Sequence, residues 1–168
     1  VDERCSCDQH PADMDPEEMV EDLNTVFSHF DSLAASYGCE KIRTIGDGYM
    51  VAAGIPVPRP DHAHALAGMA LDMIAYARQS PLTFRIGINS GPAVAGVIGT
   101  SKFQYDVWGD TVNIASRMES HGVPGRIQVS QATHDLIGDS FVCTLRGDID
   151  IKGKGTLRTW FLESRQAG

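Results

Sequence analysis

The chain has 168 residues and a formal net charge of −8, with 42% hydrophobic and 21% charged residues. This length corresponds to one domain, and the composition is that of an ordinary globular protein, which excludes a disordered tail, a collagen-like fibre and a coiled coil. The negative charge argues against a nucleic-acid-binding protein, because such proteins usually present a basic surface.

Features of membrane and secreted proteins are missing from this segment. No apolar run approaches the ~18 residues of a membrane-spanning helix, and no basic segment precedes an apolar one as in a signal peptide. The four cysteines do not form a dense disulfide framework. A zinc site at Cys5 and Cys7 would lack a second pair of ligands. We expect a cytoplasmic protein, or the cytosolic domain of one anchored upstream.

The first regular element in chain order is a helix. Asp15 is a typical cap and Pro16 a typical first-turn residue, and apolar residues then recur at intervals of three and four until Gly38. Residues 41–45 and 49–53 follow as two short strands. The Asp-Gly turn around Asp47 predicts that they form a β-hairpin.

The rest of the chain alternates between helix and strand patterns. Asp61 is expected to cap an alanine-rich helix that ends near Gln79. Further strands are predicted over 83–89, 94–98, 103–107, 126–129, 141–145 and 157–162, and helices over 110–119 and 131–137. The pattern indicates an α+β fold with a mostly antiparallel sheet and helices packed on it.

The N-terminal segment departs from this regularity. Val1 to Val20 contains no convincing buried strand before the first helix. We therefore predict that the first strand of the sheet is missing or altered, and that residues 1–14 are atypical.

Three segments could carry chemistry. Asp47 lies between two glycines, where its carboxylate could bind a metal, although Asp-Gly is also simply a favoured turn. Asn113 and Arg117 share one helix face and could hold a phosphorylated ligand, or Arg117 could pair with a nearby acid in solvent. Lys152 and Lys154 lie on a glycine-rich turn that could contact phosphate or be an ordinary basic turn.

Four stretches in order resemble the catalytic domain of class III nucleotide cyclases, and especially that of mycobacterial-type homodimeric adenylyl cyclases. The likeness extends from Asp15 to about Leu162, and is carried by residues 40–50, 87–92, 105–118 and 152–155. The resemblance implies one catalytic domain with a ferredoxin-like, mostly antiparallel sheet and helices on one face.

The resemblance also implies a reaction, the conversion of ATP to 3′,5′-cyclic AMP and pyrophosphate with two Mg²⁺ or Mn²⁺ ions per site. Asp47 matches one metal-binding aspartate, and the distance along the chain puts the other near Asp2 or Glu3. Asn113 matches the residue that orients the ribose, and Arg117 the one that stabilises charge at the α-phosphate.

Three more roles are carried over in the same way. Lys152 matches a lysine that contacts the terminal phosphates, while Arg43 and Asp106 match the two positions that select the base. Adenylyl enzymes tend to have Lys and Asp (or Thr) at these positions, and guanylyl enzymes Glu and Cys. Asp106 therefore favours adenine, and Arg43 keeps a cationic donor while departing from lysine.

The resemblance further implies a homodimer with shared active sites. Asp47, Arg43 and Asp106 would come from one protomer, and Asn113 and Arg117 from its partner. Neither nucleic acid nor a membrane is an expected partner of this segment. Two alternatives stay open at this point, a non-catalytic cyclase-homology module that dimerises or binds nucleotide, and a guanylyl cyclase.

Overall fold

A computed structural model describes residues 2–9 and 15–168, and for residues 2–9 it describes the backbone only. Four helices are present in this part of the chain: α1 (Pro16–Tyr37), α2 (His62–Ala77), α3 (Asp110–Ser120) and α4 (Gln131–Ile137). None of these described helices has both the length and the apolar character needed to cross a bilayer.

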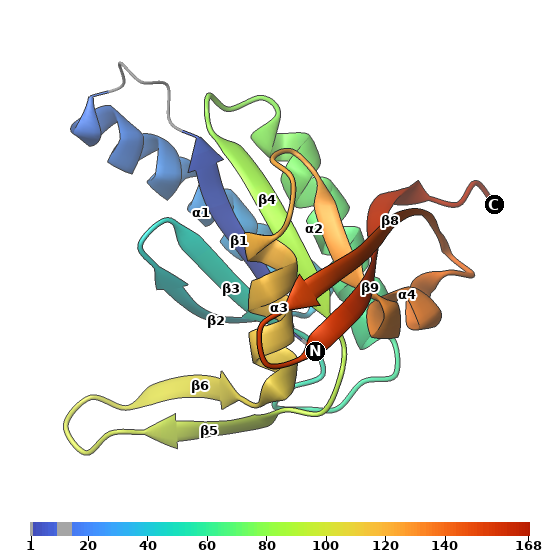
Figure 1. The fold of residues 1–168 in the computed structure, drawn as a ribbon. Helices are drawn as coiled ribbons and strands as arrows, with labels where there is room; N and C mark the ends of the chain where they lie inside the picture. Colours follow the sequence, from blue (N-terminus) through green and yellow to red (C-terminus); the bar gives the residue numbers. More distant parts are fainter. Residues whose placement is uncertain (1, 10–14) are drawn as a thin grey trace.

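Seven of the nine described strands form one sheet in the order β2-β3-β1-β4-β7-β9-β8, and all neighbours are antiparallel except β4 and β7. The other two, β5 and β6, pair with each other alone and project from the body as an arm, residues 94–108 (Figure 1). The strands are β1 (Asp2–Gln9), β2 (Glu40–Ile45), β3 (Gly48–Ala52), β4 (Thr83–Asn89), β5 (Val94–Ile98), β6 (Gln104–Trp108), β7 (Ile127–Ser130), β8 (Phe141–Ile151) and β9 (Gly155–Arg165). The predicted α+β class is confirmed.

The first strand was predicted to be missing or altered, and of these alternatives the missing strand is wrong. Asp2–Gln9 forms β1, which lies inside the sheet and pairs with β3 on one side and β4 on the other. The segment is rich in polar residues, so it lacks the apolar alternation by which a strand is found in a sequence. Its position depends on backbone pairing with two neighbours, which no local pattern reveals.

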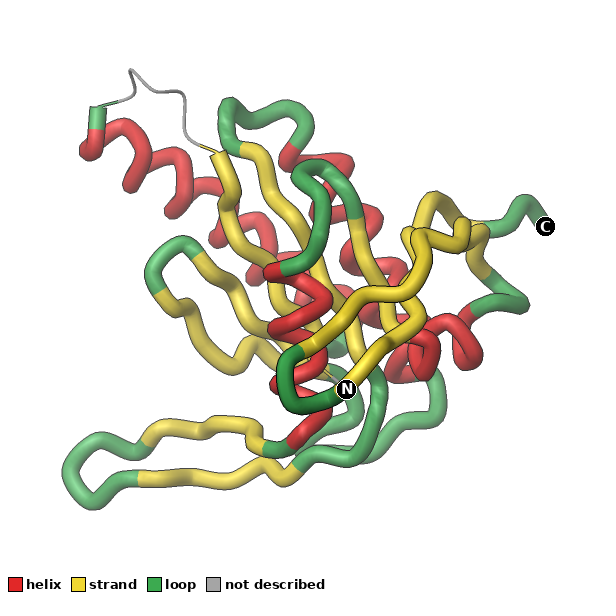
Figure 2. Tube along the Cα trace, in the orientation of Figure 1, coloured by secondary structure: helices red, strands yellow, loops and turns green. Residues whose placement is uncertain are grey.

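Helices cover both faces of the sheet, so the expectation of helices on one face is also wrong. α1 and α2 pack on the face that carries Phe84, Ile86 and Ile88 of β4. α3 packs on the opposite face, where it lies in front of β1 and β4 in Figure 1 and is coloured red in Figure 2. β8 and β9 are also longer than predicted.

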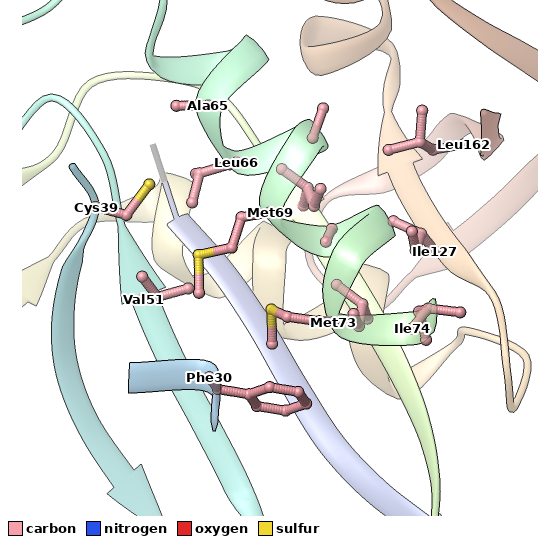
Figure 3. Packing of buried hydrophobic residues seen from close by; sticks show 14 of the residues in the cluster. Phe30, Cys39, Val51, Ala65, Leu66, Met69, Met73, Ile74, Ile127 and Leu162 are labelled. Carbon is pink, nitrogen blue, oxygen red and sulfur yellow. The ribbon is translucent and has the colours of Figure 1, made fainter. Parts of the chain in front are cut away.

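The main core lies between α1, α2 and the sheet. Met69 and Met73 of α2 are fully buried and lie between Phe30 of α1 and Val51 of β3 (Figure 3). Asp15 caps α1 by accepting a hydrogen bond from the Glu17 amide at 3.2 Å. The helix ends at Gly38, whose φ of 64° is favourable only for glycine.

A polar cluster fastens the C-terminal strand to these two helices. Arg165 donates hydrogen bonds to the Tyr37 hydroxyl at 2.7 Å and to an Asp72 oxygen at 3.0 Å, and Tyr37 itself donates to Asp72. Burial, followed by the nearby Asp72 carboxylate, raises the pKa of Tyr37 above its usual value of 10.0. The Tyr37 hydroxyl therefore stays protonated and remains a donor at neutral pH.

The packing of α3 on β4 requires a glycine at position 87. A Cβ atom there would lie 2.1 Å from the Glu119 amide nitrogen and 2.6 Å from the Met118 carbonyl carbon. The backbones of α3 and β4 can approach this closely only because Gly87 has no side chain. Arg85, two residues earlier on the same face, forms an ion pair of 2.8 Å with Glu119.

We expect Gly87→Ala to lower the free energy of unfolding by about 1–3 kcal/mol or more, because α3 must move away from the sheet. Gly96→Ala is the matched control, since its Cβ would meet only Trp108 Cζ3, at 3.5 Å, and should change stability by less than about 0.5 kcal/mol. Urea denaturation measures both. Equal effects of the two substitutions would contradict the steric role of Gly87.

Candidate active site

The start of α3 is fixed to the sheet by buried hydrogen bonds. The Asn89 side-chain amide donates to the Thr111 carbonyl at 3.0 Å, and the Thr111 hydroxyl donates to the Pro92 carbonyl at 2.6 Å. Ser130 donates to the Asn89 side-chain oxygen at 2.6 Å, which fixes the amide in turn. Together with the ion pair of Arg85 and Glu119 at the other end of α3, these bonds position the face that carries Asn113 and Arg117.

Asn113 and Arg117 line a pocket of about 410 Å³ together with Lys152 of the β8–β9 turn. The remaining lining residues are Ile114, Ser116, Ile151 and Lys154. Figure 1 shows the turn beside α3. The three residues predicted to contact ribose and phosphate are thus brought together, and the pocket gathers three cationic side chains in a chain of net charge −8. Arginine and lysine side chains at this spacing suit a phosphorylated ligand.

Asp47 lies at the tip of the β2–β3 hairpin, as predicted. Gly46 before it has a φ of 58°, which lets the backbone make the tight turn. The half-buried Asp47 carboxylate forms no ion pair or hydrogen bond with any residue whose side chain the structure describes. A carboxylate with free oxygen lone pairs is a suitable ligand for Mg²⁺ or Mn²⁺.

Arg43 and Asp106 form an ion pair, although they are 63 residues apart in the chain. Arg43 Nη1 donates to Asp106 Oδ2 at 2.7 Å, and the Val107 amide donates to Asp106 Oδ1 at 2.9 Å. Asp106 is 8% exposed. Arg43 Nε is buried and has no hydrogen-bond partner in the described structure. The pair joins β2 at the edge of the sheet to β6 of the arm.

Asp106 also lines a second pocket of about 330 Å³, formed by the arm. Its other lining residues are Ile98, Gly99, Lys102, Gln104 and Trp108. No residue of this pocket lines the one beside Arg117. A planar, partly apolar ligand group would find both an aromatic surface at Trp108 and a carboxylate at Asp106.

The predicted site residues therefore fall into two separate groups within one chain. Asp47 and Arg43 belong to the β2–β3 hairpin at one edge of the sheet, and Lys152 belongs to the β8–β9 hairpin at the opposite edge. Asp106 joins the first group through its ion pair, whereas Asn113 and Arg117 belong with Lys152.

The strand register does not bring Asp2 next to Asp47, contrary to the prediction from chain distance. Asp2 pairs with Ala52, whereas Ser6 pairs with Gly48 at the hairpin tip. At a rise of about 3.3 Å per residue, Asp2 lies on the order of 13 Å along the strand from Gly48. Asp8 is the acidic residue of β1 that follows the end of this ladder. The side chains of Cys5 and Cys7 lie outside the described residues, and the described side chains include no group of three or more metal-ligating residues.

Lys154 was predicted as a possible phosphate contact, but its ion pair with Asp110 and the lining of the arm pocket by Lys102 and Trp108 were not predicted from the sequence. Lys154 lines the pocket that contains Asn113 and Arg117, and it forms an ion pair with Asp110 at the start of α3. Lys102 and Trp108 line the pocket of the arm. The alternation of Lys152 and Lys154 with glycines was the only sequence signal for these pocket residues. The ion pair of Lys154 and the lining of the arm pocket do not follow from local spacing.

The fold is an α+β domain in which the candidate site residues form two groups, one at the β2–β3 hairpin and β6 and the other at α3 and the β8–β9 turn. Residues 5–164 match the family described as "Adenylate and Guanylate cyclase catalytic domain". The chain belongs to this family.

The relatives include enzymes of both kinds. An adenylate cyclase of Mycobacterium tuberculosis is 48% identical over 157 residues, covering 90% of this chain and 35% of the relative. Rat guanylate cyclase soluble subunit beta-2 is 42% identical over 156 residues, covering 88% of this chain and 23% of the relative. This chain thus spans about a third or less of these two curated relatives.

Among solved structures, the fold is very similar to the catalytic core of a rhodopsin-guanylyl cyclase with converted specificity, in complex with ATPαS. The TM-score is 0.91 at 34% identity, and the match covers 98% of this chain and 94% of the other.

We expect Arg43→Leu to lower the free energy of unfolding by about 1–3 kcal/mol, because the nearly buried Asp106 loses a charged hydrogen-bond donor. The matched control is Lys41→Leu on the same strand. Its ion pair with Asp31 is exposed, with side-chain exposures of 38% and 47%, and should contribute less than about 1 kcal/mol. Urea denaturation of both variants tests this, and an Arg43 effect no larger than that of Lys41 would contradict it.

Proposed function

We propose that this chain is an adenylyl cyclase domain that converts ATP to 3′,5′-cyclic AMP and pyrophosphate in sites shared by two copies. The observation that carries the proposal is the pocket in which Asn113, Arg117 and Lys152 meet, separate from Asp47, Arg43 and Asp106. Each group supplies half of the contacts that a nucleoside triphosphate needs. Family membership supports this chemistry.

The reaction needs no covalent enzyme intermediate. The ribose 3′-oxygen forms a bond to the α-phosphorus, the bond to the bridging oxygen breaks, and pyrophosphate leaves with the electron pair while the 3′-proton passes to solvent. Arg117 would donate to the α-phosphate as charge develops there, Asn113 would orient the ribose, and Lys152 would hold the terminal phosphates. Losing one such transition-state contact typically costs about 10²–10³ in rate.

The proposed Mg²⁺ or Mn²⁺ ions would be held by Asp47 and by a second carboxylate from β1. When bound, such ions favour the ribose alkoxide and offset phosphate charge. We assign the second carboxylate to Asp8 in place of Asp2, because the ladder between β1 and β3 ends with Ser6 opposite Gly48 and Asp8 is the acidic residue of β1 that follows.

Arg43 and Asp106 are better suited to bind adenine than guanine. The Asp106 carboxylate can accept from the adenine amino group, and an Arg43 N–H can donate to the neighbouring ring nitrogen. Guanine is the second candidate, because Arg43 could also donate to its carbonyl oxygen and several relatives are guanylate cyclases. Asp106 would repel that oxygen, which favours adenine.

A second copy of this chain is the proposed partner. The arm exposes large apolar side chains at Val94 (69%), Val97 (59%) and Phe103 (79%). Apolar residues gathered on a projecting hairpin are typical of a protein–protein contact. A homodimer in which the arm faces its partner would bring the two half-sites together. We further propose that the chain forms one domain that acts in the cytoplasm.

The first experiment measures product formation by the full chain with ATP or GTP and Mn²⁺, using chromatography. We expect cyclic AMP well in excess of cyclic GMP, loss of product in Asp8→Ala, and retention in Asp2→Ala. Nucleotide binding without either product would instead support the non-catalytic alternative. Cyclic GMP as the main product would contradict the assignment of the base.

The second experiment tests whether the sites are shared. Asp47→Ala and Arg117→Ala should each be inactive, and mixing them should restore up to about a quarter of wild-type activity, because random pairing gives half heterodimers with one intact site each. The control is each variant mixed with itself at equal total concentration. A mixture as inactive as its parents would contradict shared sites.

A further inference from the structure

The β8–β9 turn is built to hold two lysines close to α3. The Lys154 amide donates to the Ile151 carbonyl at 2.9 Å and closes the turn. Gly153 and Gly155 have φ values of 82° and 78°, which other residues rarely adopt. Lys152 and Lys154 both line the pocket that contains Asn113 and Arg117.

The two lysines differ in what they contact. Lys154 Nζ forms an ion pair with Asp110 Oδ1, in the first turn of α3. Lys152 forms no ion pair with any residue whose side chain is described. Asp110 lies at the positive end of the helix dipole, which stabilises its carboxylate as an acceptor. One lysine is therefore engaged by the helix while the other faces the pocket unengaged.

We propose that Lys154 is a positioning residue for phosphate binding. Its ion pair with Asp110 fastens the β8–β9 turn to the start of α3 and so keeps Lys152 within reach of the ligand held by Asn113 and Arg117. The ion pair spans the two elements that form the pocket, and no covalent or sheet contact joins the turn to α3. This inference rests on the proposed function for the nature of the ligand, the phosphates of a nucleoside triphosphate.

The alternative is that Lys154 binds phosphate itself and that Asp110 competes with the ligand for it. The two roles predict opposite effects of Asp110→Asn. If Lys154 positions the turn, the variant loses the attachment and binds more weakly. If Lys154 is a ligand, the variant frees it and removes a negative charge beside the pocket, so binding becomes tighter.

The test measures the dissociation constant for pyrophosphate by calorimetry and KM and kcat for ATP, using the full chain. We expect Asp110→Asn and Lys154→Gln each to raise the dissociation constant and KM about two- to fivefold, as the loss of an exposed ion pair allows, and the double variant to be no worse than either single variant, because both remove one interaction. Lys154→Arg should retain most of the affinity. The side chains of the pair are 40% and 55% exposed, so the thermal midpoint should change little.

The matched control is Arg158→Gln, which removes an ion pair of 3.3 Å with Asp148 on the same hairpin, outside the pocket lining. It should leave pyrophosphate binding unchanged. Tighter binding in Asp110→Asn, or no change in either single variant, would overturn the positioning role while leaving the proposed function intact. A wild-type chain that binds neither pyrophosphate nor ATP would overturn both.

Discussion

The close contact between α3 and β4 is the constraint on which the rest of the site depends. Gly87 lets the helix backbone come nearer to the strand than any side chain would allow. The buried hydrogen bonds of Asn89 and Thr111 then fix the start of α3, and the ion pair of Arg85 and Glu119 fixes its end. A helix held at three points presents Asn113 and Arg117 at a defined height above the sheet.

A second constraint connects the sheet to the arm. The body and the arm belong to different sheets, so their relative position depends on side chains, among them the ion pair of Arg43 and Asp106. The same two residues are proposed to bind the base of the nucleotide and to select it. A ligand that binds Asp106 must share its carboxylate with Arg43. The same carboxylate therefore takes part both in base recognition and in the ion pair that orients the arm. An arginine suits this position better than a lysine, because its several N–H groups can bond to Asp106 and to a base together.

Much of the fold could be predicted from local sequence signals. Asp15 and Gly38 mark the ends of α1, the Asp-Gly turn marks the β2–β3 hairpin, and apolar alternation marks β4. β1 could not be predicted, because its position comes from pairing on both sides and its residues follow no apolar period. The packing of α3 on the other face of the sheet was not predicted for a similar reason, because the close contact at Gly87 joins β4 to a helix that is distant in the chain.

The site was predictable in residue type and not in arrangement. Spacing on one helix brings Asn113 and Arg117 together. The glycine-rich turn marked Lys152 as a possible phosphate contact, and the pocket joins Lys152 to the other two residues. The position of Asp2 came from counting residues, whereas the strand register pairs Asp2 with Ala52 and brings Ser6 opposite Gly48 at the hairpin tip. Long-range pairs such as Arg43 with Asp106 have no local signature at all.

The distribution of charge provides the last connection between fold and function. A chain of net charge −8 repels a polyanionic ligand at long range, so attraction must be local. The pocket meets this need with Arg117, Lys152 and Lys154, drawn from a helix and a turn that are distant in sequence. Asp110 neutralises one of the three cations, and the charge left for the ligand therefore comes from Arg117 and Lys152. Under the proposed function, divalent cations held by Asp47 would supply the rest of the positive charge that a triphosphate needs.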